Sequence, residues 1–230
     1  MMSRALWKIL PAALCLAALA IAPACASAQS ANQQVIITWR TIGVSAPAAY
    51  VDKIIPSPNS KMEASLAVLD GNSFAPLGNQ TIYWYLDDNF IGGGAGEQTI
   101  SFNAPSNKRI ISLRAEITGG SGLMNTAYID MADPSVVIVA PYPNDTFATS
   151  TVSLEAVPYF FNASDLGDLV FDWSVNGNSV TTPENPELLT IDLANNAPSD
   201  YALNVSLNTT QSNNPYFSDS ENISLAPASQ

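Results

Sequence analysis

The sequence predicts an all-β chain in which two tandem antiparallel β-sandwich domains follow a signal peptide. Three observations support this prediction. Segments of alternating apolar and polar residues recur along the chain, turn residues separate them at even spacing, and one set of segments returns about 90 residues later. No segment beyond the first 30 residues keeps the 3.6-residue apolar period of an amphipathic helix.

The first 28 residues have the organisation of a signal peptide. Arg4 and Lys8 give a short basic start, an apolar run covers 9–22, and Ala26-Ser27-Ala28 supplies the small-x-small pattern that a signal peptidase needs. We predict cleavage after Ala28 and export to the cell envelope or the extracellular space. The apolar run of about 14 residues is shorter than the roughly 20 needed to cross a bilayer, which favours cleavage over a membrane anchor.

A lipoprotein attached through Cys25 is the alternative to cleavage after Ala28. Ala22 and Pro23 stand where a lipidation motif usually carries a leucine and a small residue, so the sequence favours the cleaved form. Both cysteines of the chain precede the predicted cleavage site, and the chain contains no histidine. The mature chain therefore offers no disulfide, no thiolate nucleophile and no Cys/His zinc site.

Charge is low in density and strongly acidic in balance. The net charge of the chain is -12 and its pI is about 4.1. Eight basic residues cannot supply the cationic surface that phosphate neutralisation requires, so nucleic-acid binding is excluded. Arg114 is the last basic residue of the chain, so the segment 132–230 contains twelve acidic residues and no basic ones. That half would therefore attract cationic partners.

A repeat divides the mature chain into two domains. The segment 82–89, with its central Trp84, matches 171–178, with its central Trp173, at a spacing of 89 residues. Matches before and after these segments keep the same order, which indicates a duplicated module. We place the boundary before Ala132, giving domains at 29–131 and 132–230, each large enough for a core of its own. The short linker with one proline predicts a rod-like tandem.

Strands are expected in sequence order wherever a period of two is clear. The first domain has them at 35–40, 62–68, 82–86, 98–103, 109–118 and 123–131, and the second at 135–140, 150–157, 169–175, 187–193, 201–208 and 217–225. Asn176-Gly177 predicts a two-residue type I′ hairpin turn, which needs positive φ at both central positions. The glycine-rich segment 92–96 lacks the lysine and helix of a phosphate-binding loop and is expected to be a flexible loop.

These elements resemble bacterial immunoglobulin-like modules of the PKD type. The resemblance comes from a strand with an inward tryptophan (Trp84 and Trp173), a polar turn, and a following strand at 99–102 or 189–192, and it covers nearly the whole mature chain. The chain is also similar to uncharacterised exported two-module proteins of small-genome bacteria. These resemblances imply an envelope or extracellular role and carry over no catalytic residue.

Three tryptophans are assigned to the structural core. Alternation places Trp84 and Trp173 on the inward faces of their strands, and Trp39 shares a face with Val35 and Ile37. Burying an aromatic ring is a principal source of stability in a sandwich, so a structural role is expected for all three.

Tyr83 and Tyr85 are the candidate ligand-binding residues, because alternation turns them outward beside Trp84. Two exposed rings on one strand could stack on a sugar or on a partner protein, or pair across the sheet. Asp165, Asp168 and Asp172 are the candidate metal ligands, since calcium prefers clustered carboxylate oxygens. Their spacing matches no standard calcium loop, so no cofactor is expected beyond this calcium possibility.

The sequence thus predicts a non-catalytic exported protein whose two modules act in scaffolding, adhesion or protein interaction. The partner is expected to be an envelope or extracellular protein, or a glycan. A carbohydrate-binding surface protein and a subunit of an exported machine such as a pilus are the alternatives. An enzyme using paired carboxylates remains the least favoured class.

Overall fold

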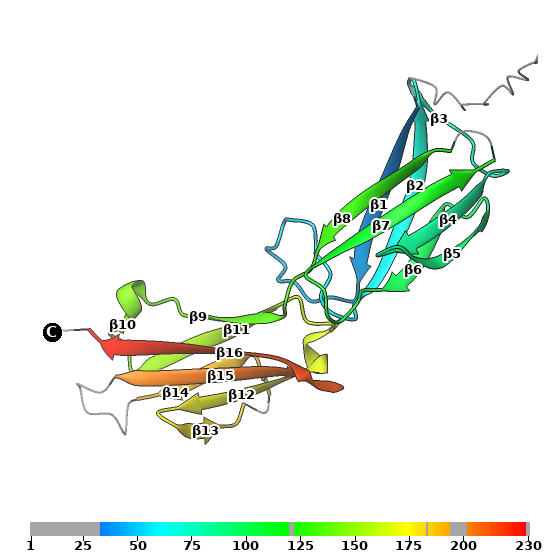
Figure 1. The fold of residues 1–230 in the computed structure, drawn as a ribbon. Helices are drawn as coiled ribbons and strands as arrows, with labels where there is room; N and C mark the ends of the chain where they lie inside the picture. The colour runs from blue at the N-terminus through cyan, green and yellow to red at the C-terminus, as the bar shows by residue number, and fades with distance from the viewer. Residues whose placement is uncertain (1–32, 120–121, 183, 194–201, 229–230) are drawn as a thin grey trace, which may run out of the picture.

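The computed structural model describes residues 33–119, 122–182, 184–193 and 202–228, and these residues form strands joined by turns (Figure 1). Within these ranges helical structure is limited to two 3-10 turns, η1 (Pro143–Asp145) and η2 (Leu166–Asp168). A membrane-spanning helix is absent from the residues that the structure describes. The predicted signal peptide and Cys25 lie outside the described residues.

The first eight strands form what we call the N-terminal sandwich. One sheet contains β1 (Gln33–Ile42), β2 (Lys61–Asp70), β3 (Ser73–Phe74) and β6 (Thr99–Asn103), with β2 at its centre. The other has the order β5 (Asn89–Ala95), β4 (Thr81–Leu86), β7 (Ile110–Thr118) and β8 (Met124–Asp130). Every pairing is antiparallel.

The remaining strands form the C-terminal sandwich. Its smaller sheet has the order β14 (Leu188–Asp192), β11 (Thr151–Tyr159) and β9 (Ser135–Val139). Its larger sheet has the order β10 (Thr146–Phe147), β16 (Asn214–Pro227), β15 (Leu203–Gln211), β12 (Leu169–Val175) and β13 (Asn178–Val180). The pairing of β10 with β16 is parallel, and the other pairings are antiparallel. The strand orders of both sandwiches are those of immunoglobulin-like domains.

Each sandwich has a core of its own. The buried apolar residues fall into two clusters without a common member, one between Val35 and Ile129 and the other between Val136 and Leu225. The period of two explains both, because residues of β2 and β7 alternate between buried and partly exposed positions. Removing this apolar surface from water is the main stabilising contribution to each sandwich.

The hairpin turns of the two sandwiches correspond in detail. Asn176 and Gly177 both have positive φ, at 50° and 80°, and connect β12 to β13 through the predicted two-residue turn. Asp87 and Asp88 occupy the equivalent turn between β4 and β5 with φ of 47° and 64°, without a glycine. Asp and Asn tolerate this left-handed region better than most residues, which explains their use here.

Nearly all expected strands are present within a few residues of the expected bounds, and β5 is the main difference. The segment 92–96, expected to be a flexible loop, supplies most of an edge strand paired with β4. The reason lies at Gly93, where φ is 153° and an added Cβ would lie 2.2 Å from the Ile82 carbonyl oxygen. Glycine is used here for close approach between strands, which a turn-based interpretation of the sequence misses.

The two sandwiches lie end to end at an angle, so the molecule is elongated and bent instead of straight (Figure 1). The long segment between β1 and β2 extends toward the C-terminal sandwich and contacts the turn that follows β11. The Ser45 amide donates to the Phe161 carbonyl (2.8 Å), and the Ser45 carbonyl accepts from the Phe160 amide (2.8 Å). The Ser45 hydroxyl accepts a third bond, from the Phe161 amide (3.1 Å).

Side chains extend this contact. The Ser57 hydroxyl, which is fully buried, donates to Asn162 Oδ1 (2.9 Å), and Asn162 Nδ2 donates to the Pro58 carbonyl (2.6 Å). The Tyr50 ring packs edge-on against Phe160, with ring centroids 5.7 Å apart. Phe160 itself has a φ of 61°, a strained conformation for a bulky residue that the surrounding contacts must hold in place.

Candidate functional site

The predicted core tryptophans have matching environments in the two sandwiches. Trp84 and Trp173 are buried, at 0% and 2% exposed, on the central strands β4 and β12. Trp84 Nε1 donates to the Glu97 carbonyl (3.0 Å), and Trp173 Nε1 donates to the Pro186 carbonyl (2.9 Å). Each acceptor lies 13 residues after its tryptophan and belongs to the same sandwich. The indole N–H of each ring therefore has a partner inside the sandwich, and both tryptophans have a structural role.

Trp39 has a different environment from the other two. It is only partly buried and packs against the margin of the N-terminal core. The Lys53 ammonium lies 3.2 Å from the centroid of its ring, a cation–π contact. Partial burial lowers the pKa of Lys53 below its ordinary value, although the aromatic ring acts in the opposite direction by favouring the charged form.

Tyr83 and Tyr85 lie on the outer face of sheet β5-β4-β7-β8, as alternation places them, but they are not freely exposed. Both pack edge-on against Phe90 of β5, with ring centroids 6.0 and 5.8 Å away. Arg114 of β7 covers Tyr85, with its Cζ 4.3 Å from the ring centroid, and forms ion pairs with Asp88 and Glu116. A flat stacking platform for a sugar requires open ring faces, and Arg114 occupies one face of Tyr85 while Phe90 contacts both tyrosines.

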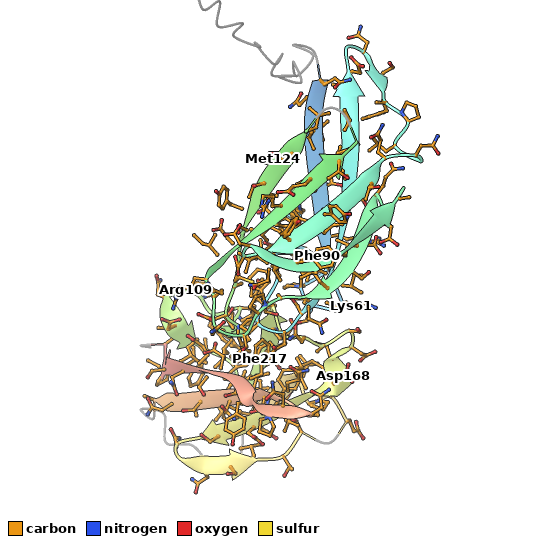
Figure 2. All side chains as sticks on the ribbon, turned by 45° about the vertical axis from the view of Figure 1, so that its right-hand side comes forward. Lys61, Phe90, Arg109, Met124, Asp168 and Phe217 are labelled. Atoms are coloured by element: carbon orange, nitrogen blue, oxygen red, sulfur yellow. The ribbon has the colours of Figure 1, made fainter. Side chains whose placement is uncertain are left out.

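Exposed apolar residues continue across the same face, which we call the aromatic face. Phe90 is 58% exposed at one edge, and Met124 and Tyr128 of β8 are 62% and 76% exposed at the other. Strand register puts Met124 opposite Glu116 and Tyr128 opposite Ser112. Phe90 and Met124 are labelled on the N-terminal sandwich in Figure 2. The aromatic face therefore consists of tyrosines, Phe90 and Met124 around the Arg114 ion pairs.

The equivalent face of the C-terminal sandwich is mostly polar, with Val170 as an exposed apolar residue. The registers of β12, β15 and β16 align Asp172 with Asn208 and Ser220, and Ser174 with Ser206 and Asn222. The Ser220 hydroxyl donates to Asn208 Oδ1 (2.9 Å), so part of this surface is bonded within itself. The same sheet of the repeated fold thus presents mainly aromatic groups in one copy and mainly amides, hydroxyls and a carboxylate in the other.

The three candidate calcium ligands have different structural positions, two in a turn and one on a strand. Asp165 caps η2, since its Oδ1 accepts from the Gly167 amide (2.9 Å). Asp168 lies in that turn, and Asp172 points outward from β12. Among the residues that the structure describes, no three carboxylate, histidine or cysteine side chains are grouped as a metal site would require. The geometry therefore adds nothing to the calcium hypothesis beyond the sequence spacing.

Three residues of the aromatic face, Phe90, Met124 and Tyr128, are not singled out by the sequence pattern. Phe90 precedes the glycine-rich segment 92–96, whose strand character the sequence does not indicate, and Met124 and Tyr128 lie within the expected strand 123–131. Alternation within 123–131 was the available signal for Tyr128, because it places that ring on the face opposite the buried Ile129.

Comparisons with known proteins find similar solved structures but no matching family. No family model matches the chain, and no curated protein matches it. Three N-terminal domains of the bacteriophage RB49 outer capsid protein Hoc align at a TM-score of 0.48 and 13% identity, covering 85% of this chain and 59% of that one. The fibronectin(III)-like modules of Clostridium thermocellum CbhA align at a TM-score of 0.30 and 11% identity, covering 84% and 94%.

The Yersinia pseudotuberculosis adhesin InvE aligns at a TM-score of 0.29 and 15% identity, over 86% of this chain and 59% of that one. This chain thus spans less than two thirds of the Hoc and InvE structures. At these identities and TM-scores none of the three transfers a function to it.

Proposed function

We propose that this chain is a non-catalytic exported protein of the cell envelope or extracellular space, whose two immunoglobulin-like modules, at 29–131 and 132–230, serve in scaffolding or adhesion. The aromatic face of the N-terminal sandwich is its protein-binding surface. The signal-peptide pattern and the resemblance to PKD-type modules and exported two-module proteins of small-genome bacteria support export.

One observation carries the choice of surface. Equivalent sheets of the two sandwiches differ. The N-terminal one gathers Phe, Tyr, Met and Arg on its solvent side, whereas the C-terminal one is mostly polar there and has, among its described residues, a single exposed aromatic ring, Tyr216, at the end of its hairpin. These residue types are enriched at protein interfaces, whereas serine is depleted there. Large exposed apolar side chains gathered on one face mark interaction sites more often than single exposed ones.

The geometry supports a protein partner over a glycan at Tyr83 and Tyr85. Both rings are already engaged by Phe90, and Tyr85 is also covered by Arg114. A partner protein can pack against the edges of such a cluster and bury Phe90 and Tyr128 as anchors. A role as subunit of an exported machine would use the same surface for a fixed neighbour.

The proposal is tested by site-specific photo-crosslinking in the native envelope. A photoreactive residue replaces Tyr128 on the aromatic face, and a matched variant carries it at Ser220, an exposed position on the polar face. We expect one defined protein adduct from position 128 and none from position 220. Equal adduct patterns from the two positions, or no adduct at position 128, would reject the aromatic face as the binding surface.

A further inference from the structure

A surface hollow lies where the two sandwiches meet, and we call it the junction groove. It is open to solvent and has a volume of about 470 Å³, larger than two other hollows on the N-terminal sandwich, which measure about 210 and 340 Å³. Pro58 and Asn59 line it from the N-terminal sandwich, Asp133 from the connection, and Asn214, Tyr216 and Asp219 from the β15–β16 hairpin. The label of Phe217, another lining residue, marks this region in Figure 2. Its volume is in the range of small-molecule sites, about 300 to 1,000 Å³.

Hydrogen bonds connect the two walls of the groove to each other through Asn162 and Gln211. Asn162 donates to the Pro58 carbonyl from its side chain, and its own carbonyl accepts from Gln211 Nε2 (2.8 Å). Gln211 ends β15 and pairs with Asn214, at the start of the hairpin wall. Asp219 Oδ2 accepts from the Val136 amide (2.9 Å), which ties the hairpin to β9. Walls fixed in this way require little ordering when a ligand binds.

The lining chemistry suits a polyhydroxylated ligand. Asn59, Ser106, Asn214 and Ser218 contribute amides and hydroxyls, which both donate and accept hydrogen bonds. The Tyr216 ring is 98% exposed, and no described ring packs against it, in contrast to Tyr83 and Tyr85. An open aromatic ring beside paired donors and acceptors provides both a stacking surface and hydroxyl recognition.

Charge narrows the class of ligand further. The described lining includes the carboxylates of Asp133 and Asp219 and no lysine or arginine. Arg109 reaches Asp133 only at 3.7 Å, and both side chains are largely exposed, so this ion pair is weak. Anionic sugars are therefore disfavoured, and protonated amino groups are favoured.

We propose that the junction groove is a saccharide-binding site for neutral or amino sugars, in which Tyr216 stacks on a sugar ring and the amides, hydroxyls and carboxylates bind its polar groups. This site goes beyond the proposed protein-binding role, because it uses other residues on another part of the molecule. A ligand here would contact both sandwiches together.

The first experiment applies the mature full-length chain to a glycan array that spans neutral, amino and uronic saccharides. Tyr216→Ala is compared with Tyr128→Ala, a matched loss of an exposed tyrosine on the aromatic face. We expect binding to neutral or amino saccharides, weakened about tenfold or more by Tyr216→Ala and unchanged by Tyr128→Ala. No binding to any neutral or amino saccharide, or equal binding by the Tyr216→Ala variant, would overturn the proposal.

Two further readouts locate the site and separate it from the proposed function. Titrating the best array saccharide should shift the amide NMR signals of Asn59, Ser106 and Asn214, and shifts confined to the aromatic face would reject the groove. Asp133→Asn should reduce any preference for amino over N-acetylated sugar, since the exposed side chain can be neutralised without disturbing a core.

Photo-crosslinking from position 128 should persist in Tyr216→Ala, so either proposal can fail alone.

Discussion

The paired tryptophans show how single residues define each sandwich. Trp84 and Trp173 occupy equivalent strand positions, and each donates to a carbonyl 13 residues later. Asp87 and Asn176 extend the correspondence, because their side chains accept from the Ser112 and Asn204 amides, both at 2.9 Å. The same hydrogen bond is made by an aspartate in one copy and by an asparagine in the other. The turn therefore requires the acceptor oxygen and not the negative charge.

A substitution of Trp84 tests this structural role. Trp84→Phe should lower the free energy of unfolding by about 2 to 3 kcal/mol, because it removes the bond to the Glu97 carbonyl and leaves a cavity in a packed core. Trp39→Phe is the control and should cost less than about 1 kcal/mol, since that ring is only partly buried. Urea unfolding followed by circular dichroism measures both. Equal costs would contradict the assigned difference in burial.

Residue burial could be predicted from the sequence wherever strands alternate. Ile82, Trp84, Phe171 and Trp173 are inward because a period of two leaves them no other face. The packing of Tyr83 and Tyr85 could not be predicted, because it depends on Phe90 from a neighbouring strand and on Arg114 from another. Alternation assigns a side chain to a face but does not say what covers it there.

Strand β5 shows the limit of local patterns for whole elements. Its three consecutive glycines carry no alternation, and their role appears only from the opposite strand, where the Tyr83 ring lies over Gly93. The β1–β2 segment is a similar case, since Ser57 and Asn162 are 105 residues apart in sequence. Contacts between residues so far apart cannot be detected from the pattern of neighbouring residues in the sequence.

Gly93 offers a direct test of the β5 arrangement. Gly93→Ala should destabilise the N-terminal sandwich by about 3 kcal/mol, because the new Cβ would meet the Ile82 carbonyl and the backbone has a φ of 153°. Gly78→Ala is the matched control, since nothing lies within 4 Å of its Cβ position, and it should change stability by less than about 1 kcal/mol. Thermal unfolding compares the two. A stable Gly93→Ala protein would show that β5 does not pair as described.

At the scale of the molecule, two sandwiches with separate cores present different surfaces. The aromatic face lies on the N-terminal copy, whereas the C-terminal copy has a polar face and the larger acidic charge. Hydrogen bonds of Ser45, Ser57 and Asn162 join the two sandwiches, so they determine how these surfaces are oriented and hold the walls of the groove together. The saccharide site proposed in the groove therefore depends on a fixed relation between the sandwiches, whereas the aromatic face lies on the N-terminal sandwich alone.

Residual dipolar couplings of the backbone amides in the mature chain test this relation most directly. If the junction holds the sandwiches as the hydrogen bonds indicate, one alignment tensor should fit the couplings of β1–β8 and β9–β16 together. Asn162→Ala, which removes the side-chain bonds to Ser57 and Pro58, should separate the two fits. Two distinct tensors in the unmodified chain would contradict a fixed junction and, with it, the preformed groove.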